Sequence, residues 1–571
     1  MGKNAAKEMK GADILLECLK KEGVDVIFGY PGGAVLEIYD SLYKSNIKHI
    51  LVRHEQGAAH MADGYARVTG RVGVCLATSG PGATNLVTGI ATAHMDSVPV
   101  VAITGNVGTH MLGTDAFQEA DIVGITLPIT KHNYLVKNVN DLAYTIKEAF
   151  HIARSGRPGP VLVDIAKDVT QKFAHFYYPE HLPASKTYHI PSQIDSALIK
   201  AAAQMIRAAK KPVILAGHGV VLSEAEHALR KFVNTTGIPV VCTLLGQGVY
   251  PSEGPYSLHM SGMHGTAYAN LAINQSDLLI AIGMRFDDRI TGKISSFATG
   301  AKKIHVDIDP AEHNKVVKVD LPIPGNALDF LNQINGVLKS KMKIGEWHTH
   351  IAALKKKHPL GIPPHKQYVT PEQIIHEMNV QTQGRAVIST DVGEHQMWAA
   401  QYLKQLNPKK WLSSGGLGTM GYGFPAAIGA WFGAKKEHVI CISGDGSFQM
   451  CLQELGTCMA YNIPVKVFIF NNNFLGMVRQ WQEIFYEKRY SQVEWGKKPL
   501  DFVKLAEAYG AMGLRVTRPN EVASVIKKAL AHKGPVVVDF VIRPEESVYP
   551  MVPAGGAIDK MLFGDQFKDE I

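Results

Sequence analysis

The sequence has 571 residues, a length that predicts three or four domains at about 150 residues each. Hydrophobic residues make up 46% and charged residues 19%, which is typical of a globular protein and excludes a disordered chain. The net charge of +8 is spread along the chain without a Lys/Arg block carrying interleaved aromatics, so we expect no nucleic-acid partner.

Membrane insertion and secretion are also not expected. No stretch approaches the roughly 18 consecutive apolar residues that cross a bilayer. The opening segment, MGKNAAKEMKGADILLECLKKEGV, lacks an apolar core and contains acidic residues, so it predicts the first helix of a cytoplasmic protein. The six cysteines are scattered without a CxxC pair, which predicts reduced thiols and neither disulfides nor a zinc site.

Short β-branched runs alternate with Gly-rich turns and helix-like segments along most of the chain, as in VGVCLATSGPG, PVLVDIAKD, PVILAGHG and VICISGDG. Nearly continuous apolar strands of this kind predict parallel sheets that are covered by helices on both faces. The predicted fold class is therefore α/β, with three doubly wound parallel-sheet domains. Such sheets bind ligands beyond the carboxyl ends of their strands.

Two linker-like stretches divide the chain into three blocks, namely 177–193 and 354–371. We expect three domains and a polar tail, at 1–176, 190–345, 366–550 and 551–571. A Gly-rich turn opens a small-residue helix at 78–93, and a similar pattern returns at 413–432. This echo is consistent with a duplicated domain or with convergent loop chemistry.

In the first block, VRHEQGAAHMADGYAR at 52–67 predicts a helix that begins near Glu55. On the residues alone, Glu55 beside Arg53 and His54 suits a surface ion pair as well as a buried carboxyl with a shifted pKa. The i, i+6 spacing of His54 and His60 does not place both rings on one helix face, which argues against a metal site.

The sharpest pattern lies in the third block, where VICISGDGSFQMCLQELGTCMAYNIPVKVFIFNNN predicts strand, Gly-Asp-Gly turn, helix, strand and Asn-Asn. Asp445 and Asn472 each follow a strand, 27 residues apart (472 − 445 = 27), so a right-handed βαβ unit brings them side by side. Carboxylate, amide and phosphate oxygens form the shell that Mg²⁺ prefers. Each motif alone is an ordinary turn, but together they predict a Mg²⁺–phosphate site.

With this pattern the chain resembles the thiamine diphosphate enzyme superfamily. The resemblance implies that Asp445 and Asn472 bind Mg²⁺ through side chains and Phe474 through its backbone carbonyl. It also implies that Glu55 contacts the aminopyrimidine ring of the cofactor and promotes loss of the thiazolium proton. In the superfamily the two outer domains share one fold and meet across a dimer interface. A homodimer or tetramer with shared active sites is therefore implied.

Several segments within about residues 10–556 resemble the acetolactate synthases in particular. The resemblance implies catalytic roles for residues of the first and middle blocks: Glu55, Gly29, Gln118, Lys167 and Arg289. It implies substrate contacts for Phe117, Arg289 and Trp481. Arg289, in GMRFDDRITGK, is expected to hold a keto-acid carboxylate through a bidentate pair, with a salt bridge to Asp287 or Asp288 as the alternative. Without the resemblance, Lys167 is typical of a solvated surface charge.

Further contacts with the thiamine cofactor are implied for the first Gly-rich loop and for the third block: Tyr30, Pro31, Gly32, Val392, Gly393, Glu394, His395, Gly418, Met420, Gly444, Gly446 and Ser447. Met420 is expected to be the apolar wedge that bends the cofactor. Two positions depart from the family pattern. Glu394 stands where glutamine is common and adds a charge near the diphosphate, and Ala166 stands where proline is expected.

The middle block combines strand ends, Gly turns and a terminal acid, which suit a dinucleotide, although it contains no GxGxxG motif. It resembles the FAD-binding domain of the same family, in which FAD is mainly structural. The implied FAD contacts are Arg157, Gly217, Gly219, Thr243, Leu244, His264, Gly283, Arg285, Asp307 and Ile308.

The reaction implied by the resemblance is decarboxylation of pyruvate and ligation of the two-carbon unit to a second keto acid. Pyruvate gives 2-acetolactate and 2-ketobutyrate gives 2-aceto-2-hydroxybutyrate, both on the route to branched-chain amino acids. A separate small regulatory subunit is expected as a partner. The alternatives are a flavin-dependent pyruvate oxidase, another thiamine diphosphate-dependent 2-keto acid decarboxylase, and a non-catalytic paralogue. The segments of Arg289 and Trp481 favour ligation, and the intact Glu55, Asp445 and Asn472 argue against a paralogue.

Overall fold

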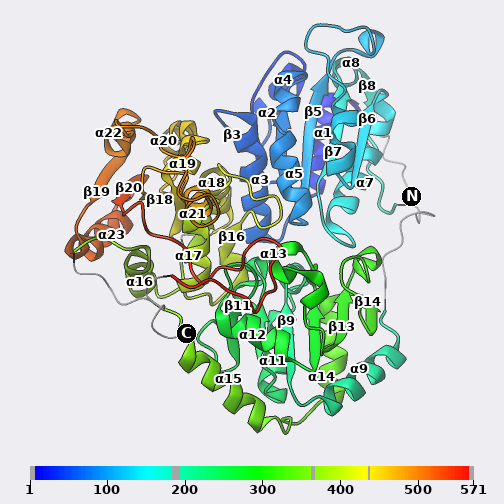
Figure 1. Cartoon of the computed structure of the whole chain (residues 1–571). Helices are drawn as coiled ribbons and strands as arrows, with labels where there is room; N and C mark the ends of the chain where they lie inside the picture. The colour runs from blue at the N-terminus through cyan, green and yellow to red at the C-terminus, as the bar shows by residue number, and fades with distance from the viewer. Residues whose placement is uncertain (1–6, 183–192, 362–366, 435–436, 565–571) are drawn as a thin grey trace.

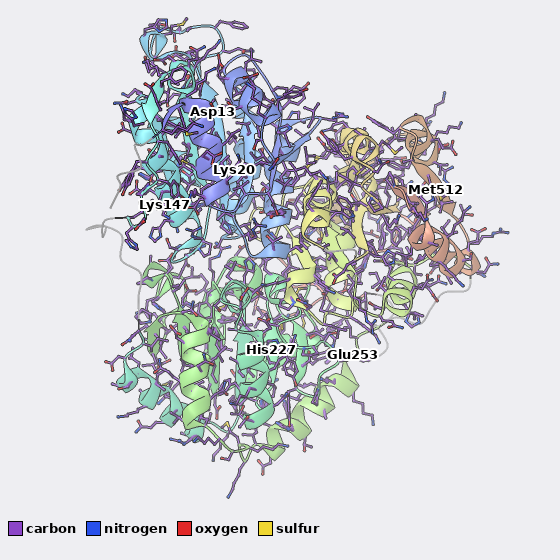
Figure 2. The ribbon with its side chains drawn as sticks, turned by 180° about the vertical axis from the view of Figure 1, so that it is seen from behind. Asp13, Lys20, Lys147, His227, Glu253 and Met512 are labelled. Carbon is purple, nitrogen blue, oxygen red and sulfur yellow. The ribbon has the colours of Figure 1, made fainter. Side chains whose placement is uncertain are left out.

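The computed structural model describes residues 7–182, 193–361, 367–434 and 437–564. Within these ranges the chain forms three six-stranded parallel sheets, one in each third, with helices packed around each sheet (Figure 1). The predicted α/β class with three doubly wound domains is confirmed. Figure 2 shows the reverse side, with Lys147 on the first domain, His227 on the middle domain and Met512 on the third. No helix among the described residues is both long enough and apolar enough to span a membrane.

The first sheet has the strand order β3-β2-β4-β5-β7-β6 and is parallel throughout. Its strands are β2 (Val26–Gly29), β3 (Lys48–Leu51), β4 (Gly73–Ala77), β5 (Val100–Asn106), β6 (His132–Val136) and β7 (Val161–Ala166). Strands β4, β5 and β7 are buried along their whole length, as expected for a sheet covered on both faces. Its helices are α1 (Gly11–Lys21), α2 (Leu36–Tyr43), α3 (Glu55–Thr69), α4 (Pro81–Thr84), α5 (Val87–Met95), α6 (Ile122–Thr126), α7 (Leu142–Arg154) and α8 (Lys167–Gln171). The short strands β1 (Glu8–Lys10) and β8 (Phe173–His175) pair antiparallel beside it.

The middle sheet has the order β11-β10-β9-β12-β13-β14. Its strands are β9 (Pro212–Ala216), β10 (Val240–Cys242), β11 (Ser257–Met260), β12 (Leu278–Ile282), β13 (Lys302–Asp307) and β14 (Leu321–Pro324). The associated helices are α9 (Ser196–Ala208), α10 (His218–Leu222), α11 (Glu226–Thr236), α12 (Ala267–Gln275), α13 (Asp288–Thr291), α14 (Ala327–Val337) and α15 (Gly345–Lys357). Helix α15 packs onto this domain through Trp347, whose indole N–H donates to the Pro212 carbonyl at 3.1 Å.

The third sheet has the order β16-β15-β17-β18-β20-β19. Its strands are β15 (Val387–Thr390), β16 (Trp411–Ser413), β17 (Val439–Gly444), β18 (Lys466–Asn471), β19 (Met512–Val516) and β20 (Val536–Val541). Its helices are α16 (Pro371–Thr382), α17 (Glu394–Tyr402), α18 (Gly423–Gly433), α19 (Asp445–Gln449), α20 (Leu455–Tyr461), α21 (Gly476–Phe485), α22 (Phe502–Ala508) and α23 (Val522–Ala531).

The two outer sheets share one topology. Numbered within each domain, both have the order 2-1-3-4-6-5, whereas the middle sheet has the order 3-2-1-4-5-6. The echo in the sequence does not mark equivalent positions, however. Residues 78–93 follow the third strand of the first sheet, and residues 413–432 follow the second strand of the third sheet. Helix α18 therefore corresponds in position to α3. The outer domains share a topology, but the repeated Gly-rich pattern does not mark equivalent positions in them.

Helices α3 and α18 join the first and third domains through very close packing. A Cβ atom added to Gly64 would lie 2.1 Å from the Ala426 carbonyl oxygen, and one added to Gly429 would lie 1.8 Å from the Met61 carbonyl oxygen. The two domains share a continuous apolar core around this contact. The start of α3, at Glu55, is therefore fixed relative to the third domain.

The chain after β20 returns to the middle domain, where it appears as the red trace beside α13 in Figure 1. The Val552 N–H donates to the Met263 carbonyl at 2.8 Å, the Lys293 N–H donates to the Gly556 carbonyl at 2.8 Å, and Ile558 lies in the middle core. The expected tail at 551–571 thus packs on the middle domain as far as residue 564. All six cysteines are buried, and none is bridged to another.

Candidate active site

A cavity of about 1110 Å³ lies where the three domains meet. Many residues that the sequence singled out line its wall, and all but Arg157 of the first domain come from the middle and third domains. They are Arg157, Gly219, Thr243, Leu244, His264, Gly283, Arg285, Arg289, Asp307, Ile308, Val392, Gly393, Gly418, Met420 and Trp481. Residues that are expected to bind flavin, substrate and the thiamine cofactor therefore lie next to one another along one wall of the cavity.

The middle-domain part of the wall is built by strand ends that approach one another closely. The Gly219 N–H donates to the Gly283 carbonyl at 2.8 Å, and a Cβ atom on Gly219 would lie 2.6 Å from the Gly283 Cα. Gly217 sits in the same turn, where a Cβ atom would lie 2.4 Å from the Met284 Cβ. This turn follows β9, at the switch point of a 3-2-1-4-5-6 sheet, which is where such sheets bind dinucleotides.

Polar atoms of this wall lack partners within the described chain. Ser261 Oγ and His264 Nδ1 are buried without a hydrogen bond, and both residues line the cavity. Burial raises the pKa of Asp307, at the end of β13, to about 6. Because buried polar groups are normally paired, these atoms fit a polar ligand such as the expected dinucleotide.

Arg289 has its charge largely unpaired. Asp287 caps α13 by accepting the backbone N–H of Arg289 at 3.0 Å, and Asp288 lies 3.8 Å from the Arg289 Nε. The side chain is 61% exposed, and its Nη1 lies 3.4 Å from the Met263 sulfur. The salt bridge that was the alternative is thus present as a single long contact with Asp288, and the exposed guanidinium keeps N–H donors that can bind a substrate carboxylate.

The third domain brings the predicted Mg²⁺ residues to adjacent strand ends. Asp445 begins α19 directly after β17, Asn472 follows β18, and these strands are paired in parallel. One oxygen of Asp445 accepts the Gly446 N–H at 3.0 Å, while Oδ2 is buried without a partner among the described residues. Burial raises the pKa of Asp445 to about 7. An uncompensated buried carboxylate oxygen fits a hard cation.

The expected diphosphate residues gather around this point. The Ser447 hydroxyl donates to the Val392 carbonyl at 2.9 Å, and a Cβ atom on Gly444 would lie 2.9 Å from the His395 Nδ1. Gly393 has φ +151°, a conformation that favours glycine. Gly446 packs against the indole of Trp495.

Glu394 is buried and lies beside the metal candidates. Its Oε2 accepts the Asn472 Nδ2–H at 3.4 Å, while Asn472 Oδ1 accepts the Phe474 N–H at 3.0 Å. Burial raises the pKa of Glu394 well above its ordinary range. A protonated Glu394 has the same charge as glutamine, so the departure from the family pattern adds no negative charge in that form.

Glu55 is buried rather than part of a surface ion pair, so that alternative is wrong. Its side chain is 8% exposed, and Oε2 accepts the Asn85 Nδ2–H at 2.9 Å. The guanidinium of Arg53 instead donates to the carbonyls of Leu51 and Gly456. Glu454, from the third domain, accepts the backbone N–H groups of Arg53 and His54 at 3.0 and 3.1 Å, and so fixes the backbone before Glu55.

Two further first-domain candidates, Gly32 and Gln118, lie with Glu55 at the turn 78–82. A Cβ atom on Gly32 would lie 2.5 Å from the Thr78 side chain, one on Gly82 would lie 3.2 Å from the Glu55 Oε1, and one on Gly80 would lie 2.8 Å from the Gln118 carbonyl. Gly29 ends β2, Tyr30 and Pro31 follow it, Lys167 begins α8, and Phe117 is 87% exposed. None of these residues lines the cavity formed by the described part of one chain.

The structure adds Thr78, Asn85 and Glu454 to the candidates from the sequence. Thr78 and Asn85 lie in the Gly-rich segment TSGPGATN, which the sequence marked only as a turn before a helix. Glu454 lies in the segment between the two metal candidates, where its long-range contact with residue 53 leaves no local signal.

Comparisons with known proteins agree with this architecture. Family models described as thiamine pyrophosphate enzyme N-terminal TPP binding domain, central domain and C-terminal TPP binding domain match residues 9–125, 199–334 and 391–540. The chain is 50% identical to an acetolactate synthase large subunit of Mycobacterium tuberculosis, over 98% of this chain and 92% of that protein. It is 48% identical to that of Pyropia yezoensis, over 98% and 96%, and 49% identical to that of Corynebacterium glutamicum, over 97% and 90%. The chain therefore belongs to the acetolactate synthase large-subunit family of thiamine pyrophosphate enzymes.

Proposed function

We propose that this protein is an acetolactate synthase that decarboxylates pyruvate and joins the two-carbon unit to a second keto acid. The acceptor is pyruvate, giving 2-acetolactate, or 2-ketobutyrate, giving 2-aceto-2-hydroxybutyrate. The observation that carries the proposal is the continuous wall that combines Arg289 and Trp481 with Gly418 and Met420. Substrate-orienting residues and the expected thiamine-side loop thus face one space.

The chain's own residues fit the cofactors of this proposal. Asp445, Asn472 and the Phe474 carbonyl would hold Mg²⁺ against a diphosphate, consistent with the unpartnered Asp445 oxygen. The orphaned atoms of Ser261 and His264 support FAD on the middle-domain wall. Thiamine diphosphate, when bound, supplies a nucleophilic carbon and an electron sink for decarboxylation.

Each polar residue then has a defined task. The buried Glu55 carboxyl holds and releases a proton at its Oε atoms and is oriented by Asn85. Arg289 orients the carboxylate of the acceptor keto acid through its exposed guanidinium. Trp481 offers an apolar surface to the acceptor side chain, where one methylene is worth about 1–3 kcal/mol.

A second copy of the chain completes the proposed site. Glu55, Gly32 and Gln118 form one group around the turn at 78–82, and this group is separate from the cavity wall of the same chain. We therefore propose a homodimer or tetramer in which the first domain of one chain faces the third domain of another. A separate small regulatory subunit and a cytoplasmic location belong to the same proposal. The buried, unbridged cysteines are consistent with a reducing compartment.

A product assay tests the function. The purified protein is incubated with pyruvate, thiamine diphosphate, Mg²⁺ and FAD, and acetolactate, peroxide and acetaldehyde are measured together. Acetolactate as the main product supports the proposal. Peroxide as the main product identifies a pyruvate oxidase, and acetaldehyde alone identifies a simple decarboxylase. Adding 2-ketobutyrate is expected to yield 2-aceto-2-hydroxybutyrate.

A further inference from the structure

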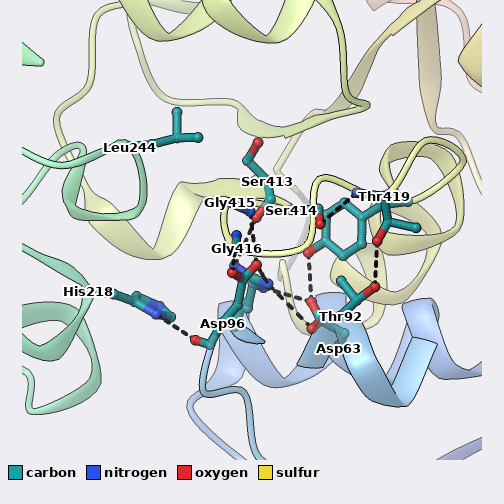
Figure 3. A network of polar contacts seen from close by, with 12 residues as sticks. Asp63, Thr92, Asp96, His218, Leu244, Ser413, Ser414, Gly415, Gly416 and Thr419 are labelled. Carbon is teal, nitrogen blue, oxygen red and sulfur yellow. Dashed lines mark hydrogen bonds and ion pairs between the residues drawn. The ribbon is translucent and has the colours of Figure 1, made fainter. Parts of the chain in front are cut away.

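A buried polar junction lies where the three domains meet beside the cavity (Figure 3). At its centre is Asp96, directly after α5, with 2% of its surface exposed. Its carboxylate accepts the backbone N–H of Gly416 at 2.7 Å and of Gly415 at 3.1 Å, and it accepts Arg67 Nη2–H at 2.7 Å. One carboxylate from the first domain thus holds a loop of the third.

Arg67 compensates the buried charge. Its guanidinium, 6% exposed, donates to Asp63 at 2.7 Å and to the Ser413 carbonyl at 3.2 Å as well as to Asp96. Asp63 also accepts the Tyr422 hydroxyl at 2.6 Å. Because buried ions are stable only when paired and hydrogen-bonded, each member of this network depends on the others.

The loop 413–420, held in this way, forms part of the cavity wall. Gly415, Gly416, Gly418 and Met420 all line the cavity. Three glycines give the loop little conformational preference of its own, so its external hydrogen bonds must fix it. A Cβ atom on Gly416 would lie 3.0 Å from the Asp96 Oδ1, which shows how closely the loop approaches the carboxylate.

A second hydrogen bond connects the first domain to the same loop. The Thr92 hydroxyl donates to the Thr88 carbonyl at 2.8 Å, so the Thr419 hydroxyl is the donor in the 2.7 Å contact between Thr419 and Thr92. This contact is neutral, and hydrogen bonds between neutral groups are weaker than those to an ionised carboxylate. Among the contacts from the first domain, Asp96 alone among the described residues accepts the backbone N–H groups of Gly415 and Gly416, while Arg67 donates to the Ser413 carbonyl and Gln396 holds Ser413 and Ser414 from within the third domain.

Asp96 also contacts the middle domain. Its backbone carbonyl lies 2.9 Å from the His218 Nδ1, and because a carbonyl only accepts, this nitrogen carries the hydrogen. His218 begins α10, next to Gly219 on the flavin-side wall. The adjacent Ser97 accepts the Arg157 Nε–H at 2.9 Å. Residues 96 and 97 thus contact both walls of the cavity.

We propose that Asp96 is a positioning residue that sets the loop 413–420 and the turn at 217–219 relative to each other across the cavity. The inference rests on the proposed function, because it assigns these two walls to thiamine diphosphate and FAD. Its consequence is that one buried residue at the edge of the cavity, through its carboxylate and its backbone carbonyl, controls the affinity for both.

The test compares wild type with Asp96→Asn in the full-length protein. Asparagine has the same size, but its amide group faces the N–H donors of Gly415, Gly416 or Arg67, so at least one donor loses its acceptor. We expect the dissociation constants of thiamine diphosphate, measured by tryptophan fluorescence at saturating Mg²⁺, and of FAD, measured by flavin fluorescence, to rise at least about tenfold each. The KM for pyruvate at saturating cofactors is expected to change much less.

Arg230→Met is the matched control, because Arg230 donates to the Leu406 carbonyl at 2.9 Å and joins the middle and third domains without lining the cavity. It is expected to leave both dissociation constants within about twofold of wild type. Thr92→Val removes the weaker hydrogen bond to Thr419, and we expect the dissociation constants of both cofactors to rise a few-fold. If Asp96→Asn does not fold, Thr92→Val decides the question, and wild-type affinities in that variant overturn the inference.

The outcomes separate the inference from the proposed function. Wild-type binding of both cofactors together with unchanged affinities in Asp96→Asn overturns the inference alone. An equal loss of affinity in Arg230→Met also overturns it, because the loss would then follow from breaking any contact between domains and not from Asp96 in particular. Wild-type protein that binds neither cofactor overturns the proposed function, and the inference with it.

Discussion

Replacing Gly429 by alanine tests the packing that fixes α3 on α18. The added Cβ atom would lie 1.8 Å from the Met61 carbonyl oxygen, whereas ordinary contact begins near 3.4 Å, so the backbones must separate by roughly 1.6 Å (3.4 − 1.8 = 1.6). Neither partner is a flexible side chain, so we take overpacking at its upper value of about 3 kcal/mol. Alanine regains about 1 kcal/mol in helix propensity. The expected net loss of stability is about 2 kcal/mol.

Gly336→Ala is the matched control. Gly336 lies near the end of α14, and its added Cβ would meet no atom within 4 Å, so this variant is expected to be about 0.5–1 kcal/mol more stable than wild type. Urea denaturation measures both changes. Acetolactate formation should fall in Gly429→Ala alone, because α3 carries Glu55 and its movement disturbs the contact with Glu454. Equal stability of the two variants would refute the reasoning.

Three further predictions concern individual side chains. Trp481→Leu is expected to lower the ratio of 2-aceto-2-hydroxybutyrate to 2-acetolactate about tenfold in a mixture of pyruvate and 2-ketobutyrate, and an unchanged ratio would contradict the apolar contact. Asp445→Asn is expected to weaken Mg²⁺-dependent thiamine diphosphate binding at least about tenfold in a fluorescence titration. Wild-type affinity in this variant would show that Asp445 does not bind the metal. Burial raises the pKa of Glu454 from 4.5 to about 7, so its contribution to stability is complete below pH 4.5 and is lost as the pH rises through 7. Glu454→Gln should flatten the pH dependence of unfolding by roughly 3 kcal/mol in that window, and parallel curves for the two proteins would disprove this.

Strands and the turns that follow them could be predicted from the sequence because their signals are local. The run VICISGDG contains a buried apolar strand and its Gly-Asp-Gly end, and it forms β17 and the start of α19. Asp445 and Asn472 could be placed on neighbouring strand ends because one βαβ unit connects them. Their approach needs no information from distant parts of the chain.

Burial and partners at the domain junctions could not be predicted in this way. Glu55 sits beside Arg53 and His54, as a surface acid often does, and its neighbours are fixed by Glu454 some 400 positions later. Asp96 lies in the unremarkable segment AHMDSVP, and its partners are at positions 67, 218, 415 and 416. The Gly-rich echo misled for a related reason, since local turn chemistry does not report strand order.

Deuterium exchange at the thiazolium carbon, followed by NMR with thiamine diphosphate and Mg²⁺ bound, tests the role of Glu55 most directly. The account predicts fast exchange in wild type and exchange at least about a hundredfold slower in Glu55→Gln, whose amide cannot exchange a proton with the aminopyrimidine ring. Equal exchange rates in the two proteins, with equal cofactor occupancy, would contradict it.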